Sequence, residues 1–266
     1  MIEPFLKWPG GKRWLAAKGL PRPTAFNRYI EPFLGGAAVF FALLPPRAVL
    51  SDINPELIDL YRTIRDDPSR LVRMLQVHHA VHNKEHYYSV RAWRPECGVE
   101  RAARTLYLNR TCWNGLYRVN KAGEFNVPIG TKSSVIFDND DFDAIAAALG
   151  NAELRCCDFE SVIDDAASGD FVFVDPPYTV KHNLNGFLKY NERMFSWSDQ
   201  LRLRDSLGRA IARGAAVVVT NADHESVREL YDGIARYQSV TRASVLAASA
   251  DRRGPTSEAL FVANLG

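Results

Sequence analysis

The chain has 266 residues, of which 47% are hydrophobic and 24% are charged, and its formal net charge at pH 7 is +2. This is the composition of an ordinary globular protein, long enough for one large domain or for one domain with an insert. No apolar run reaches the roughly 18–20 residues of a membrane span, and the N-terminus lacks the apolar core of a signal peptide. We therefore expect a cytoplasmic protein, and the small net charge neither requires nor excludes a nucleic acid partner.

Strand and helix signals alternate along the first sixty residues. Residues 28–33 (RYIEPF) predict a strand, and the following GGAAVFFALL predicts a helix that opens on glycines. Residues 48–52 (AVLSD) predict a second strand. A second helix begins at Pro55, with Asn54 as its N-cap. This alternation is typical of a parallel α/β sheet.

Residues 66–142 have a different character. Asp67-Pro68 opens a helical stretch, and residues 111–132 (TCWNGLYRVNKAGEFNVPIGTK) form a loop rich in Asn, Gly, aromatic and cationic residues. The pattern predicts a separate, less regular lobe inserted into the α/β domain. Residues 101–132 also carry six cations against one acid. On charge alone this is equally a phosphate-binding patch or a solvated charged face.

The alternation resumes after residue 145. The pattern predicts buried or half-buried strands, two helices and a terminal antiparallel hairpin. The strands are 153–157, 171–175 and 215–220, the helices are 161–166 and 198–213, and the hairpin pairs 236–245 with 259–265.

A glycine turn and an acid follow the first two predicted strands. Gly35 and Gly36 open the first helix, and Asp52 ends the second strand. In open α/β sheets ligands bind at the carboxyl ends of strands, where a glycine turn lets a cofactor approach the backbone and an acid accepts hydrogen bonds from ribose hydroxyls. NAD and S-adenosylmethionine both fit this pattern, but the absence of GxGxxG disfavours NAD. A tight turn with a capping acid is the purely structural alternative.

The sequence FVFVDPPY (171–178) combines a buried strand with an unusual ending. Asp175 offers a carboxylate, Pro176 and Pro177 hold the backbone carbonyls rigid, and Tyr178 offers a ring for stacking. These groups suit a planar amino group such as adenine N6, which two acceptors can draw toward a tetrahedral geometry. A methyl sulfonium held in line at about 3–3.5 Å would then be attacked directly, with neither a metal nor a covalent enzyme intermediate. A strand-end turn is the structural alternative.

On these motifs the chain resembles the Dam-like, D12-class DNA adenine-N6 methyltransferases over almost its whole length. The matching segments are FLKWPGGK (5–12), EPFLGGAAVF (31–40), DINPELI (52–58), residues 106–130, DPPY, and residues 250–262. The resemblance implies a Rossmann-like S-adenosylmethionine-dependent methyltransferase sheet with an inserted, mainly helical DNA-recognition lobe. The catalytic domain would comprise residues 1–65 and 143–266, and the target-recognition insert residues 66–142.

The resemblance also implies a set of site residues. The catalytic residues would be Asp175, Pro176 and Tyr178, with S-adenosylhomocysteine as the cofactor product. S-adenosylmethionine would contact Trp8, Lys12, Glu31, Pro32, Phe33, Gly35, Asp52, Phe159 and Asp175. Two positions depart from the family: Ala37 and Ala38 replace Gly and Ser, and Lys132 stands where relatives often have an aromatic residue.

The target adenine of such an enzyme lies inside a duplex, so it must be flipped out. Trp113 would stack, Asn114 would fill the vacated space, and Arg118 would read a guanine. By resemblance Lys7 reads the other guanine, and the implied site is GATC. The remaining contacts are thymine methyls for Leu116 and Pro128, and phosphates for Arg110, Asn120, Asn126 and Lys132. Residues 179–196 read as a lid with Phe187 and Tyr190 near the site.

Several alternatives stay open at this stage. DPPY also occurs in RNA base methyltransferases, which usually lack a large insert before it. A DNA-binding homologue without catalysis is a further alternative, although Trp8, Lys12, Asp52 and Asp175 are intact. A glutamine methyltransferase would more typically carry NPPY. A bacterial or phage-encoded monomer that binds double-stranded DNA is the expected form.

We expect no metal site. The four cysteines include no CxxC pair, so reduced thiols are expected in place of zinc ligands. His78, His82 and His86 have the spacing of one helix face, which can bind a metal. Such spacing is more often a surface face, here one near DNA.

Overall fold

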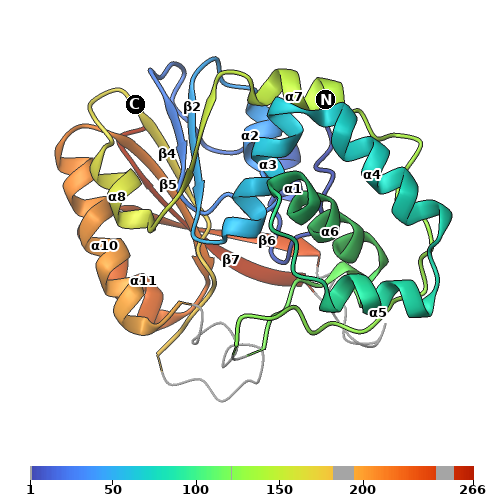
Figure 1. The fold of residues 1–266 in the computed structure, drawn as a ribbon. Coiled ribbons are helices and arrows are strands. Elements are labelled where there is room, and N and C mark those ends of the chain that lie inside the picture. Colours follow the sequence, from blue (N-terminus) through green and yellow to red (C-terminus); the bar gives the residue numbers. More distant parts are fainter. Residues whose placement is uncertain (1, 121, 182–194, 244–254) are drawn as a thin grey trace. The chain divides into compact units, whose positions relative to one another are not determined.

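The computed structural model describes residues 2–120, 122–181, 195–243 and 255–266 (Figure 1). The fold is mixed α/β, with a seven-stranded sheet among these residues. The chain divides into two compact units. The first unit comprises Met1–Ala16, Leu34–Pro46 and Asp52–Cys156, and the second comprises Ala17–Phe33, Arg47–Ser51 and Cys157–Gly266.

The elements follow the predicted alternation. The strands are β1 (Tyr29–Glu31), β2 (Ala48–Asp52), β3 (Ala152–Cys156), β4 (Phe171–Val174), β5 (Ala216–Ala222), β6 (Arg236–Ala243) and β7 (Pro255–Ala263). The helices are α1 (Arg13–Lys18), α2 (Ala38–Leu43), α3 (Pro55–Asp66), α4 (Pro68–Ala80), α5 (Lys84–Ala92), α6 (Gly98–Thr111), α7 (Phe142–Leu149), α8 (Phe159–Asp164), α10 (Trp197–Ala212) and α11 (Glu225–Tyr231), with a 3-10 turn η1 (Trp113–Gly115).

Six of the strands belong to the second unit, in the order β2-β1-β4-β5-β7-β6. β2, β1, β4 and β5 are parallel, whereas β7 is antiparallel to both of its neighbours, β5 and β6. Every residue of β4 is buried, as expected for a parallel strand covered on both faces. The predicted strands and the predicted terminal hairpin are therefore confirmed.

Two helices of the second unit, α8 and α10, pack on each other, and α10 also contacts β5 (Figure 1). Phe159 and Ile163 from α8 and Leu203 and Leu207 from α10 are buried in one core. The valines of this core are Val172 and Val174 of β4 and Val217 and Val219 of β5. Ser196 begins α10 with a capping box shared with Asp199. This packing fixes the strand ends that carry the functional side chains.

Helices dominate the first unit. α6 packs against α3, α4 and α5, and α3 also contacts α7 and β3. The Asn54 side chain accepts hydrogen bonds from the backbone of Glu56 and Leu57 at 3.0 and 3.4 Å, which confirms the predicted N-cap of α3. Asp67 caps α4 in the same way, by accepting from the backbone of Arg70.

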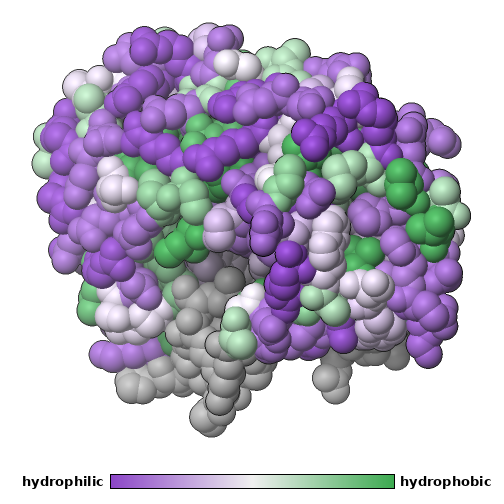
Figure 2. All heavy atoms as spheres, viewed as in Figure 1, coloured by the Kyte–Doolittle hydropathy of each residue, from purple (hydrophilic) through white to green (hydrophobic). Residues whose placement is uncertain are grey.

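The surface carries few apolar side chains. On the face shown in Figure 2, hydrophilic residues prevail and the hydrophobic areas are small and separate. Across the described ranges, none of the helices combines the length and the apolar character that a bilayer crossing requires.

Candidate functional site

The glycine turn of the first unit has no room for a side chain. Gly35 has φ +47°, and a Cβ atom there would lie 2.7 Å from Cδ1 of Trp8. The Gly35 N–H donates to Oδ2 of Asp52 at 3.2 Å, and the Tyr61 hydroxyl donates to the Gly35 carbonyl at 2.9 Å. Three predicted cofactor residues, Trp8, Gly35 and Asp52, therefore meet in one place.

Asp52 connects this turn to the start of α3. Its Oδ1 accepts from the backbone N–H of Asn54 at 3.0 Å. Burial raises the pKa of Asp52, while hydrogen bonds from the backbone of Asn54, Gly35 and Ile53 act in the opposite direction. Each carboxylate oxygen has two lone pairs, so these contacts leave Asp52 able to accept further hydrogen bonds, as from ribose hydroxyls.

Trp8 also contacts the loop predicted to recognise DNA. Its ring stacks on Tyr117, with centroids 5.0 Å apart and planes at 28°. The Tyr117 hydroxyl donates to Glu56 on α3 at 3.3 Å. Lys12 is buried nearby in the same segment, where its Nζ donates to the Gly10 carbonyl at 2.6 Å. The N-terminal segment therefore contacts both the glycine turn and the recognition loop.

The DPPY residues lie in the second unit, directly after β4. Asp175 accepts a hydrogen bond from the Thr220 hydroxyl at 2.6 Å, and the Tyr178 hydroxyl donates to Glu258 at 2.8 Å. Pro176 is buried, which is consistent with a fixed strand ending. Burial, Asp175 and Glu258 together raise the pKa of Tyr178 well above its ordinary value, so the phenol remains protonated.

Sequence reasoning missed Thr220 and Glu258. Thr220 ends the apolar run AAVVVT, and Glu258 is an acid inside a terminal strand that otherwise alternates apolar residues. An acid directly before an apolar run in the predicted strand was the signal that the sequence offered. Its partner lies 80 residues earlier in the chain, so the pairing itself could not be read from the sequence.

The remaining predicted cofactor residues of the second unit include a buried acid and two stacked aromatic rings. Glu31 is buried and accepts from the Tyr29 hydroxyl at 3.0 Å. Phe33 stacks on Phe159, with centroids 5.3 Å apart, and both rings contact Phe195. Pro32 lies between Glu31 and Phe33 in the chain and is buried. Flat aromatic rings of this kind suit the adenine of an adenosine group.

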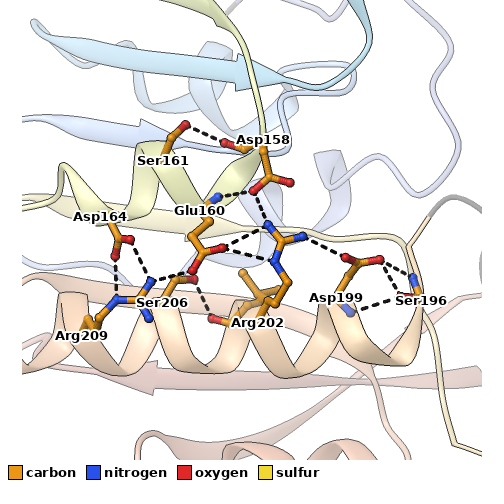
Figure 3. A network of polar contacts seen from close by, with 10 residues as sticks. Asp158, Glu160, Ser161, Asp164, Ser196, Asp199, Arg202, Ser206 and Arg209 are labelled. Atoms are coloured by element: carbon orange, nitrogen blue, oxygen red, sulfur yellow. Dashed lines mark hydrogen bonds and ion pairs between the residues drawn. The ribbon is translucent and has the colours of Figure 1, made fainter.

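Phe159 is held by charged neighbours from α10. The Arg202 guanidinium lies 4.9 Å from the centre of the Phe159 ring. Arg202 also pairs with Asp158 at 2.7 Å and with Glu160 at 3.1 Å, and Figure 3 shows these contacts as part of one network between α8 and α10. The ring is only 5% exposed, so Phe159 presents little of its own surface.

The predicted recognition loop is an irregular hairpin in the first unit. Isolated bridges pair Cys112 with Ile129 and Val119 with Phe125. Trp113 is 50% exposed, and the neighbouring Asn114 has φ +54°. An exposed aromatic ring on a strained turn is an available stacking group.

Five further predicted DNA contacts lie on this loop. Arg118 donates from Nε to Oδ1 of Asn126 at 2.8 Å, and Glu124 on the same loop pairs with Arg94. Asn120 accepts from the backbone N–H groups of Ala122 and Glu124, so it holds the turn. Leu116 is partly exposed and Pro128 is exposed.

Lys7 is fixed against this loop by a residue that sequence reasoning missed. The Asn109 amide accepts from the Lys7 N–H at 3.1 Å and donates to the Lys7 carbonyl at 2.8 Å. Gly115, at φ +65°, leaves room for the Lys7 stem. Burial and the charge of exposed Lys132 lower the pKa of Lys7. Two predicted DNA contacts, Lys7 and Lys132, therefore lie close together.

The structure departs from the expected basic patch. Arg110 is 4% exposed and pairs with Asp140 at 2.5 Å, and it also donates to the Val135 carbonyl. Arg101 and Arg104 pair with Asp59 and Glu56 on α3. The guanidinium of Arg110 holds the unit together internally, so we do not carry forward its assignment as a phosphate contact.

The histidines do not share one helix as predicted. α4 ends at Ala80 and α5 begins at Lys84, and the ring of His78 on α4 lies against His86 on α5 with Nδ1 and Nε2 3.0 Å apart. His82, between the helices, contacts the Tyr107 hydroxyl at 2.8 Å. Within the described parts of the chain, no group of three or more His, Cys, Asp or Glu side chains is arranged to hold a metal ion.

Comparisons with known proteins identify the family of this chain and several of its relatives. A family model for the D12 class N6 adenine-specific DNA methyltransferases matches residues 8–245. The type II methyltransferase M1.LlaDCHI of Lactococcus lactis subsp. cremoris is 37% identical over 100% of this chain and 96% of its own length. The DNA adenine methylase of Haemophilus influenzae is 30% identical, over 98% of this chain and 93% of its own length.

Among solved structures, the rRNA methyltransferase AviRa of Streptomyces viridochromogenes matches with a TM-score of 0.45 and 14% identity, over 100% of this chain and 91% of the other. The family model spans the glycine turn, Asp52, the recognition loop and DPPY. The chain belongs to the D12 class of N6 adenine-specific DNA methyltransferases.

Proposed function

We propose that the protein transfers a methyl group from S-adenosylmethionine to adenine N6 at GATC in double-stranded DNA, after flipping the adenine out of the helix. Membership of the D12 class gives the adenine-N6 DNA methyltransferase activity. The observation that supports the proposed chemistry is the DPPY site, where Asp175 and Tyr178 are each held by a buried partner at the end of β4.

The side chains at DPPY suit an amino group as nucleophile. The Asp175 carboxylate and the carbonyl that Pro176 holds rigid accept the two N–H bonds of adenine N6, and the Tyr178 ring stacks on the base. Nitrogen N6 then forms a bond to the methyl carbon while the carbon–sulfur bond breaks. One proton leaves N6 for solvent, and the neutral thioether S-adenosylhomocysteine is the leaving group.

The residues of both units suit the methyl donor, which supplies an electrophilic methyl group on a sulfonium. In the first unit, the Gly35 turn admits no side chain beside Trp8, and Asp52 offers acceptors for ribose hydroxyls. In the second unit, Phe33 offers a partly exposed aromatic face. We propose that Lys12 of the first unit also contacts the methyl donor, and that Glu31, Pro32 and Phe159 of the second unit do so as well.

Sequence reading is assigned to the first unit. Arg118 and Lys7 are proposed to read the two guanines of GATC, and Leu116 and Pro128 to contact thymine methyls. Trp113 and Asn114 are proposed to stack on and replace the flipped base, while Asn120, Asn126 and Lys132 face phosphates. Asn109 supports the assignment of Lys7, because it fixes the backbone from which that side chain projects.

The test is transfer of labelled methyl to two short duplexes, one with GATC and one with the same bases scrambled at the site. Asp175→Ala is the inactive control. Label on the GATC duplex alone supports the proposal. Equal label on both duplexes would support methyltransferase activity but contradict GATC as the recognition sequence. Label on RNA but not on DNA would contradict DNA as the substrate.

A further inference from the structure

The DPPY residues of the second unit contact two side chains for which the reaction described above has no role. Thr220 is fully buried on β5, and its hydroxyl donates to Oδ1 of Asp175 at 2.6 Å. The same hydroxyl lies 3.3 Å from the Val174 carbonyl. Since a hydroxyl has one hydrogen, the shorter, charge-assisted bond to the carboxylate is the stronger contact.

Glu258 is the second of these side chains. It is 4% exposed on β7 and accepts the Tyr178 hydroxyl at 2.8 Å. A buried carboxylate is strongly destabilising unless hydrogen bonds compensate for its lost hydration, so an acid at this place needs its partners. The raised pKa of Tyr178 keeps the phenol protonated as the donor.

The sheet register holds Thr220 and Glu258 together. β5 and β7 are antiparallel, with Thr220 opposite Leu260 and Ala222 opposite Glu258. Residues two apart on one strand, and residues opposite each other on paired strands, point to the same face. Thr220 and Glu258 are therefore diagonal neighbours on one face, and β7 is paired on both sides.

The DPPY residues themselves lie beyond the sheet ladder. The pairing of β4 with β5 ends at Val174 and Val219. The carboxylate of Asp175 and the ring of Tyr178 therefore depend on side-chain contacts for their orientation. A misplacement of about 1 Å in such groups can cost on the order of 100-fold in rate.

We propose that Thr220 and Glu258 are positioning residues for methyl transfer: Thr220 fixes the orientation of the Asp175 carboxylate, and Glu258 fixes the ring of Tyr178. This inference rests on the proposed function, because the rate that it concerns is that of adenine methylation. It adds the antiparallel strand β7 to the catalytic framework, which the motif DPPY alone does not include.

The first experiment compares Thr220→Val with Thr220→Ser. Valine keeps the shape without the hydroxyl, and serine keeps the hydroxyl. T220V is expected to lower the single-turnover methylation rate, at saturating cofactor and duplex, by about 10- to 100-fold, and T220S is expected to stay within about 3-fold of wild type. Ser206→Ala is the matched control, since Ser206 is a buried hydroxyl on α10 that donates to the Leu203 carbonyl at 2.9 Å.

The second experiment tests whether Glu258 acts through the Tyr178 hydroxyl. Glu258→Met removes the acceptor at similar volume, Glu258→Gln keeps an acceptor oxygen, and Tyr178→Phe removes the donor. E258M is expected to lose about 10-fold or more in rate, with E258Q within about 3-fold of wild type. In the Y178F background the effect of E258M is expected to fall below about 3-fold. The affinity for S-adenosylmethionine, measured by calorimetry, is expected to stay within about 3-fold in E258M.

The outcomes separate this inference from the proposed function. Wild-type protein that methylates no adenine in any duplex overturns the proposed function and this inference with it. Active wild type with T220V and E258M both within 3-fold overturns the inference alone. A loss in S206A equal to that in T220V, or an E258M loss of equal size in both backgrounds, also overturns it. If E258M does not fold, the methylation rate of the double variant Y178F/E258M is compared with that of Y178F. Replacing both hydrogen-bond partners by apolar groups can be nearly neutral for stability, so the double variant is expected to fold.

Discussion

Gly35 meets two separate demands that only glycine satisfies. Its φ of +47° lies in the left-handed region, and its missing side chain gives room to the Trp8 ring. Gly123, in the same unit, has φ +78° with no atom within 4 Å of where a Cβ would lie. Alanine at Gly123 would therefore introduce backbone strain alone, whereas alanine at Gly35 would introduce the same strain and a clash with Trp8.

Gly35→Ala is expected to lower the affinity for S-adenosylmethionine by about 10-fold or more, because the new methyl must displace Trp8 or shift the turn that carries the Asp52 contact. Calorimetric titration with S-adenosylmethionine measures this. Gly123→Ala carries the backbone strain alone and is expected to keep the wild-type affinity. Equal affinity in G35A and wild type would contradict the role of this turn in cofactor binding.

At the scale of helices and strands, the sequence predicted the elements whose signals come from residues close together in the chain. The strand β4 could be predicted from its run of apolar Phe and Val residues. The helix α3 could be predicted from Asn54-Pro55, because the capping hydrogen bonds of Asn54 reach only two or three residues along the chain. The histidine stretch was misassigned because Asn83 caps α5 and so divides a spacing that looks continuous. Periodicity alone does not reveal such a break.

The candidate site was predictable only where its residues belong to motifs. Asp52, Asp175 and Tyr178 lie at or just after the carboxyl ends of strands, where parallel sheets bind their ligands. Asn109 was missed because its partner Lys7 lies 102 residues away in the chain. Arg110 was assigned to DNA because charge is visible in a sequence, whereas its burial against Asp140 is a property of the packed unit.

The junction of α4, α5 and α6 predicts how stability depends on pH. His78 stacks on Tyr107, contacts His86 at 3.0 Å and has His82 nearby, and burial lowers the pKa of His78 to about 4. The unfolded chain therefore binds more protons than the folded chain between the ordinary pKa of His78, 6.5, and about 4. The stability contributed by neutral His78 is fully present above pH 6.5 and is lost as pH falls through this window.

Urea unfolding between pH 7 and pH 4.5 measures this effect. The free energy of unfolding is expected to fall by about 1–2 kcal/mol on account of the protonation of His78. His78→Gln removes the titrating group and is expected to flatten the pH dependence, at some cost in stability. His224→Gln, which changes an exposed histidine in the second unit, is the control. An unchanged pH dependence in H78Q would contradict this assignment.

At the scale of the whole molecule, the small net charge is the sum of many internal pairs. Arg101, Arg104 and Arg110 are each paired with an acid of the first unit, so their charges are balanced within that unit. Lys132 is exposed and close enough to Lys7 to lower its pKa. DNA binding is therefore expected to depend on where a charge lies more than on the net value of +2.

Lys132→Gln and Arg101→Gln change the net charge of the protein by the same amount and thereby separate these two possibilities. If Lys132 faces a phosphate, K132Q weakens binding to the GATC and the scrambled duplex alike and reduces the slope of log K against log salt by about 0.9. R101Q removes a charge already paired with Asp59 at 2.8 Å and is expected to leave the slope unchanged. Fluorescence anisotropy with labelled duplexes over a range of KCl concentrations measures both slopes. Equal reductions in the two variants would mean that net charge, not the position of Lys132, governs the attraction to DNA.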